Sequence, residues 1–271
     1  MSLLFVLFLV LAGVGTGIYG TLVGLGGGFV VVPLLLYVYP DESPRIITAI
    51  SLAVIFFNAL SGTVAYARMR RIDYVTGIPY ALSAVPGALL GAFISRYVSR
   101  ELFYVLFGLL LSGVSIFLLL RPRARLSLPV AGSSRLLVDG SGRVHSYRTS
   151  LGLGMGLSLV AGFVATTLGL GGGSLHIPIL ITLLQFPVHV ATATSTFILS
   201  ITAFTASVAH LGGGAYSGTW QVVLALGAGV VLGAQVGARL SDRVGGTLLM
   251  RLLALALLAV GGRLLWQGLV G

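Results

Sequence analysis

The sequence lacks cysteine and lysine, and it is poor in charge of either sign. Without a cysteine among its 271 residues it has no disulfide, no thiolate nucleophile and no Cys-ligated metal. All sixteen basic residues are Arg, and only six residues are acidic. Charged residues make up 8% of the chain, against roughly 25% in soluble domains, which need them to keep their surface hydrated. This composition excludes an ordinary soluble domain.

Long apolar runs replace the missing charge. Hydrophobic residues make up 57% of the chain and the mean hydropathy is +1.07. Runs close to the ~20 residues that cross the hydrocarbon core as a helix recur at 46–67, 74–95, 102–120 and 246–266. The arginines lie in short loops between these runs, a pattern typical of membrane orientation signals rather than of a nucleic-acid-binding face. We therefore expect an integral membrane protein that contacts lipid and no nucleic acid.

Carboxylates are absent from the apolar runs. The six acidic residues all lie in loops or at segment ends: Asp41, Glu42, Asp73, Glu101, Asp139 and Asp242. Cation carriers and proton pumps usually depend on buried carboxylates, so their absence favours an anionic substrate. The chain also shows no paired carboxylates, no Ser–His–Asp set and no metal-ligand spacing. We expect no enzyme activity, no metal and no cofactor.

The chain contains an internal duplication. The run Gly-Leu-Gly-Gly-Gly at 24–28, followed by Pro33, recurs at 169–173, followed by Pro178, at a constant offset of 145. After a one-residue gap, Ser51 matches Ser195, and the ordered matches continue beyond it. The duplication predicts a first transmembrane repeat at 1–120, a basic linker at 121–148 and a second repeat at 149–271. Two short apolar stretches around an Asp-Gly-Ser-Gly turn predict either a small hairpin in the linker or a disordered tether.

Each repeat contains five hydrophobic segments, the second of which is short. We place them at 2–24, 28–39, 46–67, 74–95 and 102–120, and at 149–169, 173–186, 188–211, 219–238 and 245–266. Twelve helical residues rise only ~18 Å, little more than half of the hydrocarbon core. A glycine cluster precedes each short segment and a proline lies inside it, so we expect a broken or re-entrant first helix pair in each repeat.

The arginines favour one orientation. If the linker is cytoplasmic and each first pair enters and leaves on one face, twelve arginines lie inside and Arg45, Arg96, Arg100 and Arg263 lie outside. Counting each first pair as a single crossing lowers this bias to ten against six. The positive-inside rule therefore favours the first arrangement, in which an odd number of segments inverts one repeat relative to the other. Inverted repeats whose broken helices meet at the membrane midplane are a recurrent transporter plan. The fold class predicted is an all-α polytopic membrane protein of two inverted repeats.

The two glycine clusters are the main candidate site. Glycine lets backbone N–H groups converge on a ligand, and helix N-termini add positive partial charge, an arrangement that suits an anion. The alternative is close helix packing, which is the preferred interpretation of the spacing of Gly229, Gly233 and Gly237. The candidate substrate-binding positions of the clusters are Gly24, Gly26, Gly27, Gly28, Pro33, Gly169, Gly171, Gly172, Gly173 and Pro178.

Polar side chains inside the apolar segments complete the candidate set. Two hydroxyl-bearing positions correspond under the repeat, so they can face one site, although a helical hydroxyl can also bond to its own preceding turn. We include Ser51, Asn58, Thr194, Ser195, Thr196 and His176 as substrate-binding candidates. Ionisable or phenolic groups at membrane depth are functional candidates, and His176, His210 and Tyr66 are assigned to proton transfer or gating. A neutral histidine that links two helices is the structural alternative.

The duplicated motif resembles the signature of the TauE/SafE sulfite exporter family. The similar residues are Gly-Leu-Gly-Gly-Gly-x₄-Pro-Leu at 24–34 and Gly-Leu-Gly-Gly-Gly-x₄-Pro-Ile at 169–179, with Arg-Ile-Asp-Tyr at 71–74 and Leu-Gly-Ala at 90–92 and 232–234. The resemblance implies an inner-membrane exporter of sulfite, sulfonates or other small organic anions. The chain departs from the family pattern at Ala49-Ile50-Ser51, where a more polar Thr-Ser run is typical.

The leading hypothesis is a prokaryotic inner-membrane transporter that exports a small anion by alternating access between the repeats. An anion channel and a non-transporting membrane assembly protein remain as alternatives. The sequence leaves open which anion is carried and whether the chain forms a homo-oligomer.

Overall fold

The computed structural model describes residues 2–120, 133–212, 214–216, 218–241 and 247–270. The first half contains five α-helices: α1 (Leu3–Val23), α2 (Gly28–Val38), α3 (Pro44–Arg68), α4 (Tyr74–Ile94) and α5 (Arg100–Leu120), with a short 3₁₀ helix η1 (Ser95–Tyr97). The second half contains α6 (Leu151–Thr167), α7 (His176–Pro178), α8 (Val188–Gly212), α9 (Trp220–Leu240) and α10 (Thr247–Val270). The predicted all-α membrane class is confirmed, since five of the described helices are long and apolar enough to cross a membrane.

Local capping explains where the long helices begin. The side chain of Ser2 accepts a hydrogen bond from the amide of Phe5 at the start of α1, and Ser43 does the same for Ile46 at the start of α3. Asp73 caps α4 by accepting from the amides of Val75 and Thr76. These side chains satisfy amides that have no partner in the first helical turn.

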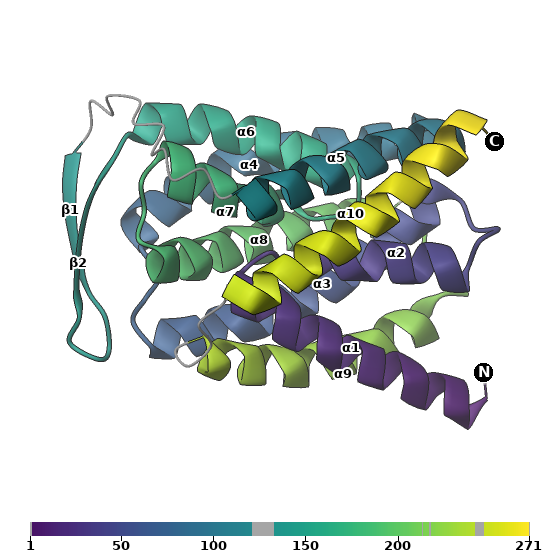
Figure 1. Cartoon of the computed structure of the whole chain (residues 1–271), viewed down its shortest axis with the longest axis horizontal. Coiled ribbons are helices and arrows are strands. Elements are labelled where there is room, and N and C mark those ends of the chain that lie inside the picture. Colours follow the sequence, from purple (N-terminus) through teal and green to yellow (C-terminus); the bar gives the residue numbers. More distant parts are fainter. Residues whose placement is uncertain (1, 121–132, 213, 217, 242–246, 271) are drawn as a thin grey trace.

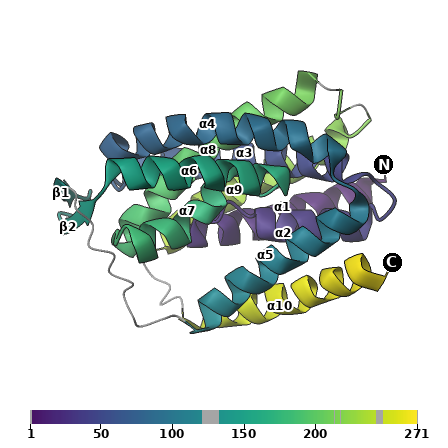
Figure 2. The same ribbon diagram turned by 90° about the horizontal axis from the view of Figure 1, so that it is seen from above.

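The two halves pack on each other reciprocally. The first helix of each half lies along the fourth helix of the other, so α1 packs on α9 and α6 packs on α4, while α3 and α8 cross in the middle (Figure 1). Gly13 approaches Gly229 and Gly17 approaches Gly233 at backbone distance along α1 and α9, which confirms the packing role predicted for this glycine series. Figure 2 shows α5 and α10 side by side at the edge of the bundle.

Figure 1 shows the N-terminus, the C-terminus and the end of α2 at one end of the bundle. The linker hairpin lies at the opposite end, where α6 begins and α8 starts. The chain thus doubles back after α1, because the short α2 returns to the end from which α1 set out.

The short segment of the second repeat differs from its counterpart. Whereas α2 is an 11-residue helix, the matching stretch is a 3₁₀ helix η2 (Gly172–Leu175), a single turn of α7 and a π-helical turn η3 (Ile179–Leu183). The expectation of one regular short helix there is wrong. The glycine cluster and the proline are shared with α2, whereas His176, whose ring bonds to the carbonyl oxygen of Gly172, has a valine at its equivalent position in α2.

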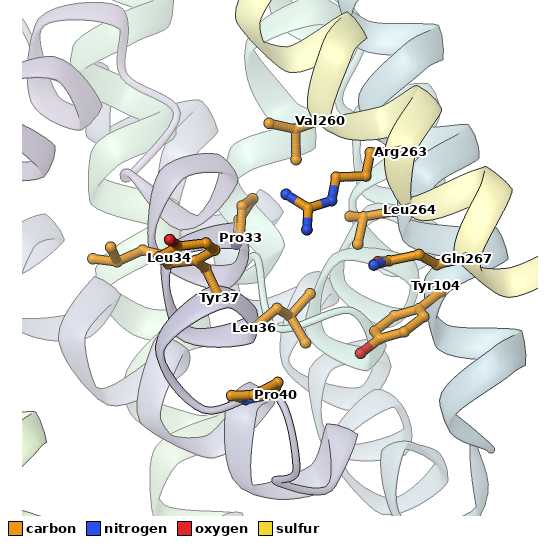
Figure 3. Close-up of a pocket in the computed structure, with 10 residues that line it drawn as sticks. All are labelled: Pro33, Leu34, Leu36, Tyr37, Pro40, Tyr104, Val260, Arg263, Leu264 and Gln267. Atoms are coloured by element: carbon orange, nitrogen blue, oxygen red, sulfur yellow. The ribbon is translucent and has the colours of Figure 1, made fainter. Parts of the chain in front are cut away.

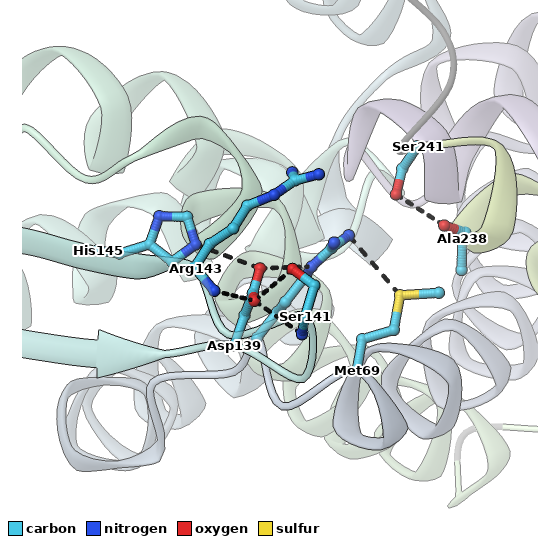
Figure 4. Close-up of polar contacts among 8 residues, drawn as sticks. Met69, Asp139, Ser141, Arg143, His145, Ala238 and Ser241 are labelled. Carbon is cyan, nitrogen blue, oxygen red and sulfur yellow. Dashed lines mark hydrogen bonds and ion pairs between the residues drawn. The ribbon is translucent and has the colours of Figure 1, made fainter.

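The linker contains a β-hairpin, which confirms one of the two predicted alternatives. Strands β1 (Ser133–Val138) and β2 (Val144–Thr149) pair antiparallel with Leu136 opposite Ser146. Residues 121–132 of the predicted linker lie outside the described residues, as does Arg243 of the orientation count. The turn is organised by Asp139, whose carboxylate accepts from the amides of Ser141 and Arg143 (Figure 4).

The hairpin is bound to the loop between α3 and α4. The Arg71 guanidinium lies 3.7 Å from the Asp139 carboxylate, and both side chains are buried. The amide of Gly140 donates to the carbonyl oxygen of Met69 at 2.8 Å, and the Tyr147 hydroxyl donates to the Asp73 carboxylate at 2.7 Å. The same Asp73 caps α4, so the hairpin is connected directly to the start of a membrane-spanning helix.

Candidate functional site

The two glycine turns are held by serines from the opposite repeat. The Ser51 hydroxyl on α3 donates to the carbonyl oxygen of Gly169 at 2.7 Å. The equivalent Ser195 on α8 donates to the carbonyl oxygen of Gly24 at 3.2 Å, and also to Thr192 of its own helix at 3.0 Å. The predicted correspondence of these serines therefore appears as a pair of crossed hydrogen bonds that join the repeats.

Positive φ angles explain why glycine occupies the turns. Gly24, Gly26 and Gly27 have φ of 78°, 72° and 80°, and Gly169 and Gly171 have φ of 72° and 71°. A residue with a β-carbon is strained in this left-handed conformation, so residues other than glycine are disfavoured there. Gly172 and Gly173 belong to the 3₁₀ helix η2 and do not share this conformation.

Two apolar side chains fill the space between the turns. A β-carbon on Gly26 or on Gly171 would collide with Leu199, and each also lies beside Ile55. Ile55 and Leu199 occupy equivalent positions on α3 and α8, and both are fully buried. Gly28 lies against the backbone of Leu170, so the two turns also contact each other. In this conformation Ile55 and Leu199 enclose the two turns, and the absence of glycine side chains permits this close packing.

Buried polar groups without partners lie beside both turns. Asn58, one helical turn beyond Ile55, accepts a hydrogen bond from Thr21 at 3.1 Å, while its Nδ2 has no partner among the described residues. Thr48 lies against Gly169, and its hydroxyl also has none in the part of the chain that is described. A buried donor without a partner carries a desolvation cost that a bound ligand or water would relieve.

Sequence reasoning missed Thr48 and Thr21. Both have a threonine at the equivalent position of the second repeat, Thr192 and Thr166. Applying the offsets of 144 and 145 residues that identify the duplication would therefore have identified both threonines as candidates.

The other predicted hydroxyls lie in different surroundings. Thr194 accepts from the amide of Asp73 at 3.0 Å, so it faces the loop that binds the hairpin. Thr196 donates to the carbonyl oxygen of Thr192 in its own helix at 2.8 Å. Of these three consecutive residues, only Ser195 contacts a glycine turn.

His176 links the second turn to α6. Its Nδ1 lies 2.8 Å from the carbonyl oxygen of Gly172 and its Nε2 lies 2.8 Å from the Ser158 hydroxyl. The side chain is fully buried and both ring nitrogens have partners. This geometry fits the alternative of a histidine that connects two helices.

The remaining predicted residues are spread along the bundle. Tyr66, near the end of α3, donates to the carbonyl oxygen of Thr21 at 2.8 Å. His210, near the end of α8, is buried, and its Nε2 has no hydrogen-bond partner within the described chain. Pro33 lies inside α2 and lines a separate cavity, while Pro178 ends α7. Tyr66 and His210 occupy equivalent helix ends in the two repeats.

Three pockets of about 480, 540 and 720 Å³ lie elsewhere in the described structure. The first lies between α2, α5 and α10, the second between α5 and α6, and the third beside the hairpin. None of these three is lined by a glycine of either turn.

Comparison with known proteins relates this architecture to membrane transporters. The chain is 33% identical to "Probable membrane transporter protein YunE" of Bacillus subtilis, over 96% of this chain and 97% of the relative. It is 28% identical to "Probable membrane transporter protein ORF9" of Sinorhizobium sp, over 95% of this chain and 91% of the relative. A 90-residue stretch, 33% of this chain and 18% of the relative, is 33% identical to "Sulfite exporter TauE/SafE family protein 3" of Arabidopsis thaliana. No solved structure matches the chain.

The family comparison covers both glycine turns. Residues 9–264 match the family described as "Sulfite exporter TauE/SafE", a range that includes all the candidate site residues. Together with the similarity to the Bacillus protein over nearly the whole of both chains, this match shows that the chain is an integral membrane protein belonging to the TauE/SafE sulfite exporter family.

Proposed function

We propose that the chain exports a small anion, such as sulfite, a sulfonate or a related organic anion, at a site between the two glycine turns. The observation that carries this proposal is the pair of unpartnered buried donors, Asn58 Nδ2 and the Thr48 hydroxyl, beside turns that Ser51 and Ser195 hold together. Buried polar groups are normally hydrogen-bonded, and a transported anion would supply the missing acceptor. Thr48 and Asn58 lie ten residues apart on α3, about 15 Å along the helix, so a small anion would accept from one of them at a time.

The charges around the turns support an anion rather than a cation. The amides of Gly27 and Gly28, at the start of α2, donate no hydrogen bond to another described residue. They lie at the positive end of the α2 dipole, which attracts negative charge. The five acidic residues in the described part of the chain all lie in loops or at helix ends, so none of their carboxylates competes with an anion at the turns.

Alternating access is supported by the opposite ends of the bundle from which the two helix pairs extend to their glycine turns. The pair α1 and α2 extends from the end that holds both termini, while α6 and the segment from η2 to η3 extend from the hairpin end (Figure 1). We propose that the repeats are inverted in the membrane, with the hairpin on the cytoplasmic side. Rocking one repeat against the other would move Ile55 and Leu199 apart and open the turns to one side at a time.

Transport by purified protein in liposomes tests the site. Thr48→Val removes an unpartnered hydroxyl and keeps the side-chain shape, so it should lower sulfite or sulfonate export without lowering thermal stability. Thr205→Val is the matched control, because Thr205 bonds only to the carbonyl oxygen of Ile201 in its own helix. Asn58→Asp keeps the acceptor for Thr21, loses the Nδ2 donor and adds a negative charge, and it should abolish export. Normal export by both site variants would refute the site.

A channel is the second candidate, and the enclosed turns argue against it. A conducting pore needs a water-filled path, whereas the turns here are packed against Ile55 and Leu199 and border none of the three pockets. Single-channel currents of wild-type protein in a planar bilayer would contradict the carrier mechanism.

A further inference from the structure

A cavity of about 480 Å³ separates α2 from the pair formed by α5 and α10 (Figure 3). Its volume lies within the ~300–1,000 Å³ typical of small-molecule sites. Its walls are mainly apolar, with four residues from α2, four from α10, Tyr104 from α5 and Pro40 from the loop after α2.

Arg263 is the unusual member of this lining. Its guanidinium extends from α10 toward Pro33 on α2 (Figure 3). It forms no hydrogen bond or ion pair with any residue in the described ranges. An ionisable side chain on a helix in the membrane is costly unless it reaches water or a partner of opposite charge. The Arg263 side chain is exposed, so the cavity presents one accessible positive group beside an apolar wall.

A second arginine lies at the edge of the same cavity but is already engaged. Arg100 donates to the carbonyl oxygens of Pro40 and Glu42, and its guanidinium carbon lies 6.0 Å from the ring centre of Tyr104. Pro40 and Tyr104 both line the cavity. Arg100 therefore fixes the edge of the cavity and adds positive potential, which leaves Arg263 as the group available to a ligand.

We propose that this cavity binds an anionic phospholipid, with the phosphate on Arg263 and an acyl chain along Pro33, Leu36 and Leu264. Arginine binds phosphate through charge-assisted and often bidentate hydrogen bonds. The apolar wall selects a ligand with a hydrocarbon tail, because a small hydrophilic anion would gain nothing from contact with it. Tyr37 is 75% exposed at this face, so the cavity is open to the surrounding bilayer.

Such a lipid would brace α2, the helix that begins at the first glycine turn. The apolar contacts would hold α2 at its present distance from α5 and α10. This inference needs only that the chain is embedded in a bilayer, so its failure would leave the proposed transport site untouched.

Binding to delipidated protein tests the proposal. A phosphatidylglycerol with a photoactivatable acyl chain should crosslink to the peptides that contain Pro33–Pro40 and Val260–Gln267, as mapped by mass spectrometry. Arg263→Gln should weaken phosphatidylglycerol binding about fivefold, the effect expected for the loss of one arginine–phosphate contact at a membrane surface. Arg263→Lys should retain most of the binding, which separates loss of charge from misfolding. Arg239→Gln, the same change in the last turn of α9, should bind as the wild type does.

Three outcomes would overturn the proposal. One is equal binding of phosphatidylglycerol by wild type and Arg263→Gln. Another is equal crosslinking by phosphatidylcholine, whose head group has no net charge, because it would show a groove for any lipid. The third is full displacement of the lipid by inorganic phosphate or sulfate, because it would show a site for free anions.

Discussion

The hydroxyl of Ser51 donates a 2.7 Å hydrogen bond to the carbonyl oxygen of Gly169, a residue of the opposite repeat. Its equivalent, Ser195, returns the contact to Gly24 at 3.2 Å but shares its hydrogen with Thr192. The two repeats are therefore joined at their glycine turns by crossed bonds of unequal strength.

This inequality predicts different costs for removing the two hydroxyls. Ser51→Ala leaves the buried carbonyl of Gly169 without this donor, and we expect it to lower the free energy of unfolding by about 1–3 kcal/mol. Ser195→Ala should cost less, because its bond to Gly24 is longer and shared. Apparent melting temperatures in detergent would measure the difference. Ser200→Ala is the control, since Ser200 bonds only within its own helix, to Phe197. A larger loss for Ser195→Ala than for Ser51→Ala would contradict the assignment.

The sequence predicted the equivalence of the two serines but not their partners. Ser51 and Gly169 lie 118 residues apart, and the duplication alone does not say that each serine crosses to the other repeat. Likewise, Thr194, Ser195 and Thr196 form one polar cluster in the sequence. Successive side chains on a helix point about 100° apart, so they could not all face one turn.

The number and approximate bounds of the long helices were predictable, because composition alone determines which runs can cross a bilayer. The irregular segment from Gly172 to Leu183 was not predictable from its match to α2. The two stretches share a glycine cluster and a proline, but the tertiary surroundings decide how each one is coiled. His176, which bonds to Gly172 and Ser158, has a valine, Val31, at its equivalent position in the first repeat.

The conformation of the first turn predicts that Gly26 tolerates no side chain. Gly26→Ala would place a methyl group into Leu199 at a φ of 72°, so the strain and the clash act together. We expect little folded protein, as judged by size-exclusion chromatography in detergent. Gly15→Ala is a matched control on α1, because a β-carbon there meets no atom within 4 Å and alanine favours the helix. Normal yield of Gly26→Ala would show that the turn has room for a side chain.

The hairpin offers a third prediction, because Arg71 and Asp139 form a buried ion pair at 3.7 Å. Asp139→Asn removes one charge of the pair and should free the hairpin from the loop between α3 and α4. Removal of one partner leaves the other charge without its counter-ion, which weakens the contact between the hairpin and the loop. Trypsin should then cleave after Arg143 and Arg148 several times faster than in the wild type. His145→Gln is the control, because His145 lies 3.4 Å from the same carboxylate at a more exposed position and should change cleavage little. Unchanged cleavage of Asp139→Asn would show that the ion pair does not hold the hairpin.

The same carboxylate predicts how the hairpin responds to acid. Hydrogen bonds from Ser141, together with those from the Arg143 amide and His145, hold the pKa of Asp139 well below its usual value, despite an opposing effect of burial. A carboxyl group whose pKa is lowered on folding stabilises the folded state above its unfolded pKa of about 3.9. That contribution is lost only as the pH falls below this value toward the lowered one. The hairpin should therefore remain bound at pH 5.

Spin labels can measure this binding. The natural chain has no thiol, so Ser134→Cys and Met69→Cys can carry two spin labels whose separation reports whether the hairpin is bound. We expect the same label separation at pH 7 and pH 5. Release of the hairpin between these values would contradict the assignment, because even a carboxyl group of ordinary pKa stays almost fully charged at pH 5. It would show that the pKa of Asp139 lies above its ordinary value, and that its hydrogen bonds to Ser141 and Arg143 do not stabilise the charged form.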